Sequence, residues 1–290
     1  MSERQDFEHY RPLLFSIAYR MTGTAMDAED IVQDTYLRYS RVEPSEIQSL
    51  KHYLTTITTR LCINKMTSAK TQREQYIGNW LPEPIATDGQ TTPGNPYDEV
   101  TKLDSISMAF LVLLEQLTPS ERAVFILREI FDYEYAELAQ ILNKSEDSCR
   151  KILSRARQHL SANRPRFDSD PQKHQVILQQ FLQAVSDGQV EQLVDMLADD
   201  AVLVGDGGNR YGAATRPIYG GKHIAAFFNG IRRFYQQLAL QAVIKQVNGL
   251  PSIIIYDGTA IYAVLTLNIE AGKIKRIHLI GNDDKLKYIR

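Results

Sequence analysis

The sequence of 290 residues lacks several features that mark special classes of protein. No stretch approaches the roughly 20 consecutive apolar residues of a membrane-spanning helix. The charged beginning, MSERQDFEHYRPLL, has no apolar run of the secretory type. Cysteine occurs only as Cys62 and Cys149, which excludes a disulfide scaffold and is typical of a reducing compartment. We therefore expect a cytoplasmic protein with no membrane partner, no metal site and no cofactor.

An excess of charge of one sign is also missing. The net charge is −2 and the pI is about 6.3, which argues against a protein that coats nucleic acid by bulk charge. With 43% hydrophobic and 23% charged residues, the chain has the composition of ordinary globular proteins. Its length predicts two or three domains, whose charges have to be examined separately.

The first half of the chain is predicted to be helical, with one interruption. Proline-rich residues 71–104 form a predicted linker, which contains the sequence WLPEP at 80–84 and the single tryptophan, Trp80. Trp80 either docks on a partner surface or packs on the nearest domain. Before Pro119, Thr118 is placed to cap a helix in a capping box with Glu121. The predicted helices cover 7–21, 26–39, 48–67, 103–116, 120–130, 135–142 and 145–161.

The pattern changes at about residue 172. Two helices (172–186 and 190–197), the short apolar run 201–205 and a helix at 221–236 precede runs rich in Ile, Val and Tyr. Turns of the hairpin type separate these runs, so we predict an α+β domain with a curled antiparallel sheet. The predicted strands cover 238–247, 252–256, 260–269 and 273–280.

Residues 136–160 have the spacing of a helix-turn-helix, with Ser145 placed to cap the second helix. That helix has one apolar stripe and one basic face, as a helix that enters the major groove requires. A solvated basic face on a helical hairpin is the alternative. The apolar stripe is Cys149, Ile152, Leu153, Ala156 and Leu160. The expected DNA contacts are Glu146, Ser148, Arg150, Lys151, Ser154 and Arg155.

Two helices near the N-terminus have opposite charge. The second helix presents acid, which suits a basic protein partner, although a solvated face explains the same pattern. The third helix is basic, and its hydroxyls and aromatic ring suit phosphate and an unstacked base. The acidic group is Asp27, Glu29, Asp30, Gln33 and Asp34. The basic group includes Lys51, His52, Tyr53, Arg60 and Lys65.

Together these features resemble a bacterial RNA polymerase sigma factor. The segments DAEDIVQDTYLRYSR, KHYLTTITTRLCINKM and LTPSERAVFILREIFDYEYAELAQIL…KILSRAR occur in the order seen in the sigma-70 family. The chain is similar to the extracytoplasmic function (ECF) group, which keeps only regions two and four. This resemblance implies a region 2 helical bundle at 1–70, the linker at 71–104 and a region 4 helix-turn-helix at 105–163.

The resemblance also implies a role for each charged group. Glu29, Asp30, Gln33 and Asp34 would dock on the β′ clamp helices of core RNA polymerase, and region 4 would meet the β flap. The basic third helix would open and read the minus-ten element of promoter DNA as single strand. The helix-turn-helix would read the minus-thirty-five element as duplex.

The C-terminal part resembles the SnoaL-like domain of the SigJ-like type of ECF factor, which has an NTF2-like α+β cone fold. Three motifs carry this resemblance and imply a built-in regulator that contacts the sigma core and the linker. For the second motif, a plain tight turn is the alternative. The direction of the regulation stays open. The motifs are WLPEP (Trp80, Leu81, Pro82, Glu83, Pro84), Asp206-Gly207-Gly208, and Asn282-Asp283-Asp284-Lys285-Leu286.

Such cones enclose a pocket, so an enzyme or a ligand-binding domain has to be considered. The polar candidates show no paired carboxylates and no nucleophile beside a base, so we expect no catalytic residues and no enzyme. His278 lies in an alternating strand, where a histidine is more often satisfied or exposed than catalytic. The alternative is a helix-turn-helix regulator with a ligand-binding or enzymatic domain at 172–290, whose effector is a small molecule or a protein. The candidates are Asp206, Arg216, Tyr219, His223, His278 and Asp283.

Overall fold

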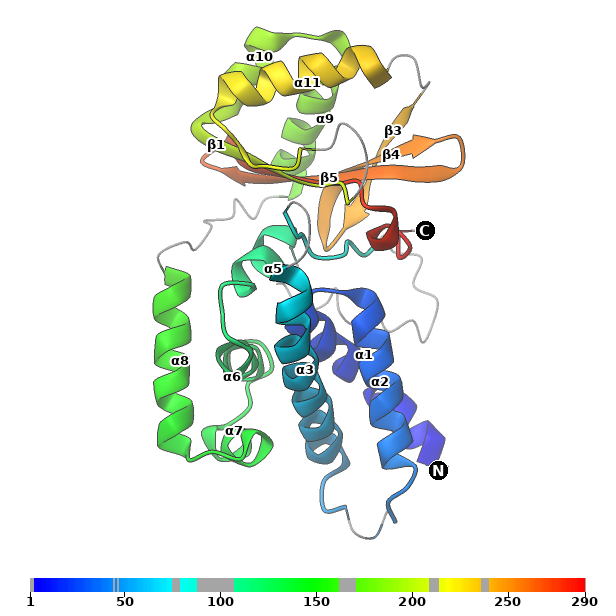
Figure 1. Ribbon diagram of the computed structural model, residues 1–290, viewed down its shortest axis with the longest axis vertical. Helices are drawn as coiled ribbons and strands as arrows, with labels where there is room; N and C mark the ends of the chain where they lie inside the picture. Colours follow the sequence, from blue (N-terminus) through cyan, green and yellow to red (C-terminus); the bar gives the residue numbers. More distant parts are fainter. Residues whose placement is uncertain are drawn as a thin grey trace. The chain divides into compact units, whose positions relative to one another are not determined.

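The computed structural model describes residues 3–43, 45, 47–74, 79–87, 107–161, 171–208, 214–235 and 240–289 (Figure 1). These residues form two compact units, which are described one at a time. The helical unit contains the described residues up to 74 and from 110 to 161. The C-terminal unit contains residues 79–87, 107–109 and 171–289. Most of the predicted linker 71–104 lies outside the described residues.

The helical unit begins with three helices whose apolar sides pack together. Gly23, with φ 75°, ends the first helix, and the hydroxyl of Thr24 accepts a hydrogen bond from Asp27 N to begin the second. Phe7, Ile31 and Leu54 are buried between the three helices. The helices are α1 (Glu3–Thr22), α2 (Ala25–Tyr39) and α3 (Leu50–Glu74).

Four shorter helices follow, and caps set two of their boundaries, of which the one at Thr118 was predicted. Thr118 and Glu121 form the capping box, and Asn143 ends α7 in the left-handed region at φ 52°. The predicted apolar stripe on α8 is buried throughout. The helices are α5 (Met108–Leu114), α6 (Pro119–Glu129), α7 (Tyr135–Leu142) and α8 (Glu146–Ser161).

The two groups of helices pack directly on one another within the helical unit, where α3 lies against α6 and α7, and α1 against α6. The fully buried guanidinium of Arg122 on α6 donates to the carbonyl oxygen of Arg20 on α1 at 2.7 Å. A buried charge is stable only when it has hydrogen-bond or ionic partners. This contact therefore holds the two groups of helices against one another.

The C-terminal unit is a curved six-stranded sheet in the order β2-β1-β6-β5-β4-β3, with helices on one face (Figure 1). The core between helices and sheet includes Phe181, Phe228, Leu203 and Leu267. The helices are α9 (Pro171–Asp187), α10 (Val190–Met196) and α11 (Gly221–Tyr235). The strands are β1 (Leu197–Asp206), β2 (Ile218–Tyr219), β3 (Gln241–Val247), β4 (Leu250–Asp257), β5 (Ala260–Glu270) and β6 (Lys273–Ile280), and a short 3-10 helix, η2 (Asp283–Lys285), follows.

The predicted α+β class and the antiparallel pairing of the four predicted strands are confirmed, but the sheet also contains a parallel pair that was not predicted. The turn Asn248-Gly249, with φ 52° and 74°, joins β3 to β4 as predicted, and β4, β5 and β6 continue antiparallel. The strand β1, however, pairs with β6 in parallel and with β2 antiparallel. Hairpin turns indicate pairing between successive strands only, so the long-range pairing of β1 left no local signal.

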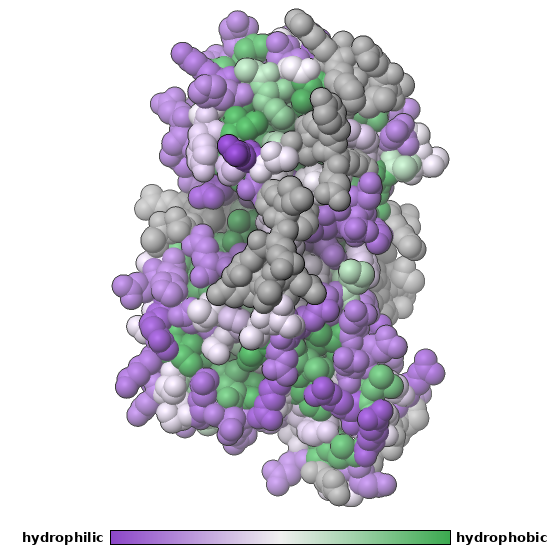
Figure 2. All heavy atoms as spheres, viewed as in Figure 1, coloured by the Kyte–Doolittle hydropathy of each residue, from purple (hydrophilic) through white to green (hydrophobic). Residues whose placement is uncertain are grey.

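Figure 2 shows hydrophilic residues over much of the described part of the face in view, with smaller hydrophobic patches between them. Among the described residues, no helix has the length and apolar character needed to cross a membrane.

Candidate functional site

The recognition helix α8 presents most of its predicted DNA contacts to solvent. Arg150 is half exposed and is held by two carboxylates, from Glu146 at 2.9 Å and Asp147 at 3.3 Å. Ser148 is half-buried, and its backbone N–H donates to the hydroxyl of Ser145, which caps the helix as predicted. The exposed members are Glu146, Arg150, Lys151, Ser154 and Arg155.

The acidic face of α2 is exposed at its centre and paired at its edge. Asp30, Gln33 and Asp34 are exposed, whereas Glu29 is half-buried and accepts a hydrogen bond from Arg11 at 2.9 Å. The exposed part of this face therefore consists of two carboxylates and an amide on successive turns.

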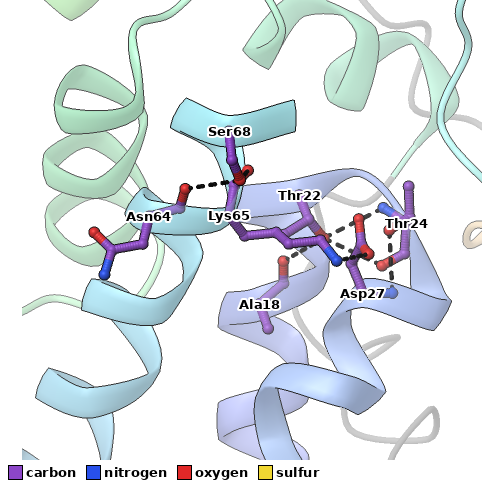
Figure 3. A network of polar contacts seen from close by, with 7 residues as sticks. All are labelled: Ala18, Thr22, Thr24, Asp27, Asn64, Lys65 and Ser68. Atoms are coloured by element: carbon purple, nitrogen blue, oxygen red, sulfur yellow. Dashed lines mark hydrogen bonds and ion pairs between the residues drawn. The ribbon is translucent and has the colours of Figure 1, made fainter. Parts of the chain in front are cut away.

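Figure 3 shows the ion pair that closes the other edge of this acidic face. Lys65 on α3 reaches Asp27, in the first turn of α2, with its Nζ 2.8 Å from the carboxylate. The hydrogen bond with Asp27 raises the pKa of Lys65. The structure thus places one predicted DNA contact, Lys65, beside the predicted polymerase face.

Other predicted minus-ten residues on α3 contact region 4 in this structure. Arg60 donates to the carbonyl oxygens of Ile141 and Gln140, at 2.9 and 3.1 Å, which lie at the end of α7. The Nζ of Lys51 lies 5.2 Å from the ring centroid of Tyr133. Sequence reasoning missed this use of Arg60 and Lys51, because no local pattern indicates which surface lies opposite a helix.

The same ring fixes α3 by a second contact. The hydroxyl of Tyr133 and that of Thr55 are 2.8 Å apart and buried. His52 and Tyr53, the remaining predicted minus-ten residues, are half-buried on the first turn of α3. The basic face of α3 is therefore partly covered by the helix-turn-helix of the same unit.

In the C-terminal unit, the three predicted motifs meet at one buried ion pair. The carboxylate of Asp206, at the end of β1, accepts hydrogen bonds from Leu81 N at 2.8 Å and from Lys285 Nζ at 2.6 Å. Lys285 also donates to the carbonyl oxygen of Leu81 at 2.5 Å and lies 4.3 Å from the ring centroid of Trp80. Both charged side chains are at most 7% exposed. Segments far apart in the sequence are thereby joined through one carboxylate.

A second attachment lies at the other side of the sheet. Ile85 N donates to the side chain of Asn248 at 3.1 Å, Asn248 N donates back to Ile85 O at 2.9 Å, and Thr87 N donates to Gln246 O at 2.9 Å. Because β1 and β3 are separated in the sheet by β6, β5 and β4, residues 79–87 run across the sheet. Leu203 faces the helical core, so Asp206 points to the opposite face.

The glycines after Asp206 support both interpretations of this motif. Gly208 has φ 56°, as a tight turn requires, and a Cβ on it would lie 3.0 Å from the side chain of Asn282. Asn282 in turn caps η2 by accepting a hydrogen bond from Asp284 N. The turn at Gly208 therefore also packs against the tail at Asn282, and the helix that Asn282 caps carries Lys285, which pairs with Asp206.

The six polar pocket candidates differ in exposure and in their contacts. Asp206 is used in the linker attachment, and four others are exposed. No group of three His, Cys, Asp or Glu side chains that would hold a metal ion occurs within the described residues. The exposed candidates are Arg216, Tyr219, His223 and Asp283.

His278 differs from the expectation of a satisfied or exposed histidine. It is 1% exposed, its Nδ1 lies 3.3 Å from the hydroxyl of Thr266, and its Nε2 has no hydrogen-bond partner among the described residues. Burial, with a smaller contribution from the charge of Arg276, lowers the pKa of His278 to about 4. The strand alternation was correct, but it could not show that this face of the sheet is covered.

Comparison with known proteins decides the family. The description "Sigma-70 region 2" matches residues 7–72, and "Sigma-70, region 4" matches residues 107–160. The chain is 33% identical to the ECF RNA polymerase sigma factor SigJ of Mycobacterium tuberculosis, over 98% of this chain and 93% of the relative. The chain belongs to the ECF sigma factors. It therefore acts with RNA polymerase in promoter recognition, as members of this family do.

Two further similarities extend over the whole length. The "Probable ECF RNA polymerase sigma factor SigI" of Mycobacterium tuberculosis is 32% identical over 97% of this chain and 93% of its own. The crystal structure of the Mycobacterium tuberculosis extracytoplasmic function sigma factor SigJ superposes with a TM-score of 0.80, 31% identity and 99% coverage of both chains. The full-length match includes the C-terminal α+β unit.

The buried, neutral His278 predicts a loss of stability in mild acid. In the folded protein its pKa is about 4, below the ordinary value of 6.5. The unfolded chain therefore takes up a proton more readily, and the folded state loses stability as the pH falls from 6.5 toward 4. At pH 5 we expect a loss of about 2 kcal/mol in the free energy of unfolding. Urea unfolding at pH 7 and pH 5 measures it. His278→Asn should remove most of this loss, while the exposed His223→Asn should retain it; equal losses in both variants would contradict the assignment.

Proposed function

We propose that this ECF sigma factor docks on core RNA polymerase through the exposed acid of α2 and reads promoter DNA through α3 and α8. The observation that carries the proposal is the separation of charge within the helical unit. Asp30 and Asp34 are exposed on α2, whereas Arg150, Lys151 and Arg155 are exposed on α8. An acidic patch suits a basic polymerase surface such as the β′ clamp helices, and a basic recognition helix suits duplex DNA.

We also infer that the packing of α3 on α7 is a closed form of the protein. The minus-ten and minus-thirty-five elements lie about 25 base pairs apart, which is about 85 Å of duplex. Within the helical unit, Arg60 on α3 bonds directly to the carbonyl oxygen of Ile141 on α7 at 2.9 Å. Two regions in direct contact do not reach both elements at once, so promoter recognition requires their separation.

The C-terminal unit is proposed to control that separation through the linker. Glu74 and Met108 end and begin the helices on either side of the linker, and residues 79–87 between them are bonded to the C-terminal sheet at both ends. A chain that is tied at two points cannot extend fully. The domain is thereby suited to restrain regions 2 and 4, and release of the linker favours the open form.

Reversal of charge on α2 tests the polymerase interface. Asp30→Lys with Asp34→Lys should weaken the affinity for core RNA polymerase at least about tenfold, because like charges then face the basic partner. The exposed pair Asp187→Lys with Glu191→Lys, in the C-terminal unit, is the matched control. Fluorescence titration with core polymerase measures both variants. Unchanged affinity of the α2 variant would refute the proposed interface.

Breaking the buried ion pair tests the regulatory role. Asp206→Asn with Lys285→Met removes both charges, which avoids the cost of about 3–5 kcal/mol of leaving one buried charge unpaired. The released linker should raise the yield of run-off transcription with core polymerase. Asp200→Asn removes the exposed carboxylate that pairs with Lys275 and is the control. A yield equal to or below that of the wild type, in a folded variant, would contradict a restraining role.

Removal of one hydroxyl tests the closed form. Tyr133→Phe deletes the 2.8 Å hydrogen bond to Thr55 and leaves that buried hydroxyl unpaired, at a cost of about 1–2 kcal/mol to the closed form. The apparent affinity for core polymerase should therefore rise about fivefold or more. Thr67→Val, which deletes a hydroxyl bonded only within α3 at Ile63 O, is the control. An affinity unchanged from the wild type would show that this contact does not oppose binding.

A further inference from the structure

One aromatic ring in region 4 contacts two guanidinium groups from different helices. Tyr135 is the first residue of α7 and is half-buried. The guanidinium carbon of Arg150, on the recognition helix α8, lies 4.6 Å from its ring centroid. That of Arg128, on α6, lies 5.0 Å from the same centroid. Both distances are within the range of a cation–π interaction.

Each guanidinium is also held at its edge. Arg150 is paired with Glu146 and Asp147, as described above, and its side chain is 50% exposed. Arg128 donates to the carbonyl oxygen of Tyr133 at 2.8 Å and pairs with Glu134 at 3.1 Å. These bonds use the N–H groups in the plane of each guanidinium, whereas the ring uses the face.

The separate use of the edge and the face of the guanidinium has a consequence for DNA binding. An arginine that reads guanine does so with two N–H groups at its edge, so Arg150 has to exchange its carboxylate partners for a base. The contact with Tyr135 uses the face of the guanidinium and survives that exchange. A free arginine side chain loses about 2 kcal/mol of rotamer entropy when it is fixed, and the ring reduces this loss in advance.

We propose that Tyr135 is a positioning residue for promoter reading, which holds Arg150 toward the base edges and Arg128 toward the adjacent backbone phosphate of the minus-thirty-five element. Arg128 lies outside the recognition helix and outside the contacts predicted from the sequence. The inference rests on the proposed function, because it requires that α8 enters the major groove. Arg150 is the fifth residue of α8, within the N-terminal turns that reach base edges in helix-turn-helix proteins.

The test uses the full chain in holoenzyme with core polymerase and a duplex promoter library whose minus-ten and minus-thirty-five elements are randomised. Selection with the wild type defines the preferred element, and affinities are then measured for each single base-pair change. Tyr135→Leu should lower promoter affinity about fivefold and reduce discrimination at the base pair where Arg150→Ala also reduces it. Tyr135→Phe keeps the ring and should match the wild type.

Two further variants separate positioning from packing. Tyr135→Leu added to the pair Arg128→Ala with Arg150→Ala should bind no more weakly than that pair alone, because the ring acts through those two arginines. Arg128→Ala should weaken all sequences equally and reduce the slope of log affinity against log salt by about 1. Tyr256→Leu, which removes the ring 5.9 Å from Lys245 in the C-terminal unit, is the matched control.

The outcomes distinguish the two levels of the proposal. If Tyr135→Leu weakens all sequences equally, or adds fully to the pair Arg128→Ala with Arg150→Ala, or lowers the melting temperature and the affinity for core polymerase, then the ring is only a packing residue and the inference is overturned. If Arg150→Ala leaves discrimination at every base pair unchanged, the assignment of α8 to base reading fails, and the role of Tyr135 fails with it.

Discussion

The buried carboxylate of Asp206 is the group on which the attachment of the linker to the C-terminal unit depends. A carboxylate that is removed from water is strongly destabilising unless its charge and its lone pairs are both satisfied. Here Lys285 supplies the charge, and Leu81 N supplies a backbone donor. Since these partners come from the tail and from the linker, the cost of leaving Asp206 unpaired acts against release of either segment.

A second constraint operates inside the helical unit, where Arg60 contacts α7 and is also a proposed contact of promoter DNA. Arg60 donates to two carbonyl groups in the last turn of α7, of which Gln140 O also accepts a hydrogen bond from Asn143 N. In the proposed open form this guanidinium is free for phosphate. The cost of opening is then the loss of these hydrogen bonds, about 1 kcal/mol each, together with the buried contacts of Arg122 with Arg20 O and of Tyr133 with Thr55, and contact with polymerase has to outweigh it.

The sequence allowed the helices to be predicted well because their boundaries are encoded locally. Thr118 and Glu121 define one helix start by hydrogen bonds within four residues, and Asn143 and Asn248 accept the left-handed conformation that their turns require. The parallel pairing of β1 with β6 could not be predicted in this way, since it joins segments with four strands between them in the chain. Of the site, the motifs around Asp206 and Lys285 were found through resemblance, whereas their common carboxylate emerged only from the fold.

The ion pairs between charged side chains could not be predicted from the sequence either. They show how the positive and negative charges behind the net charge of −2 are distributed. Cations that were expected on DNA are paired with acid in the free chain: Lys65 with Asp27, and Arg150 with Glu146. Exposed pairs of this kind are worth at most about 1 kcal/mol each, so phosphate can replace the carboxylates. Every such exchange nevertheless subtracts from the free energy of binding to DNA. We therefore propose that the chain has little affinity for arbitrary DNA by itself and depends on the polymerase to bring its basic helices to a promoter.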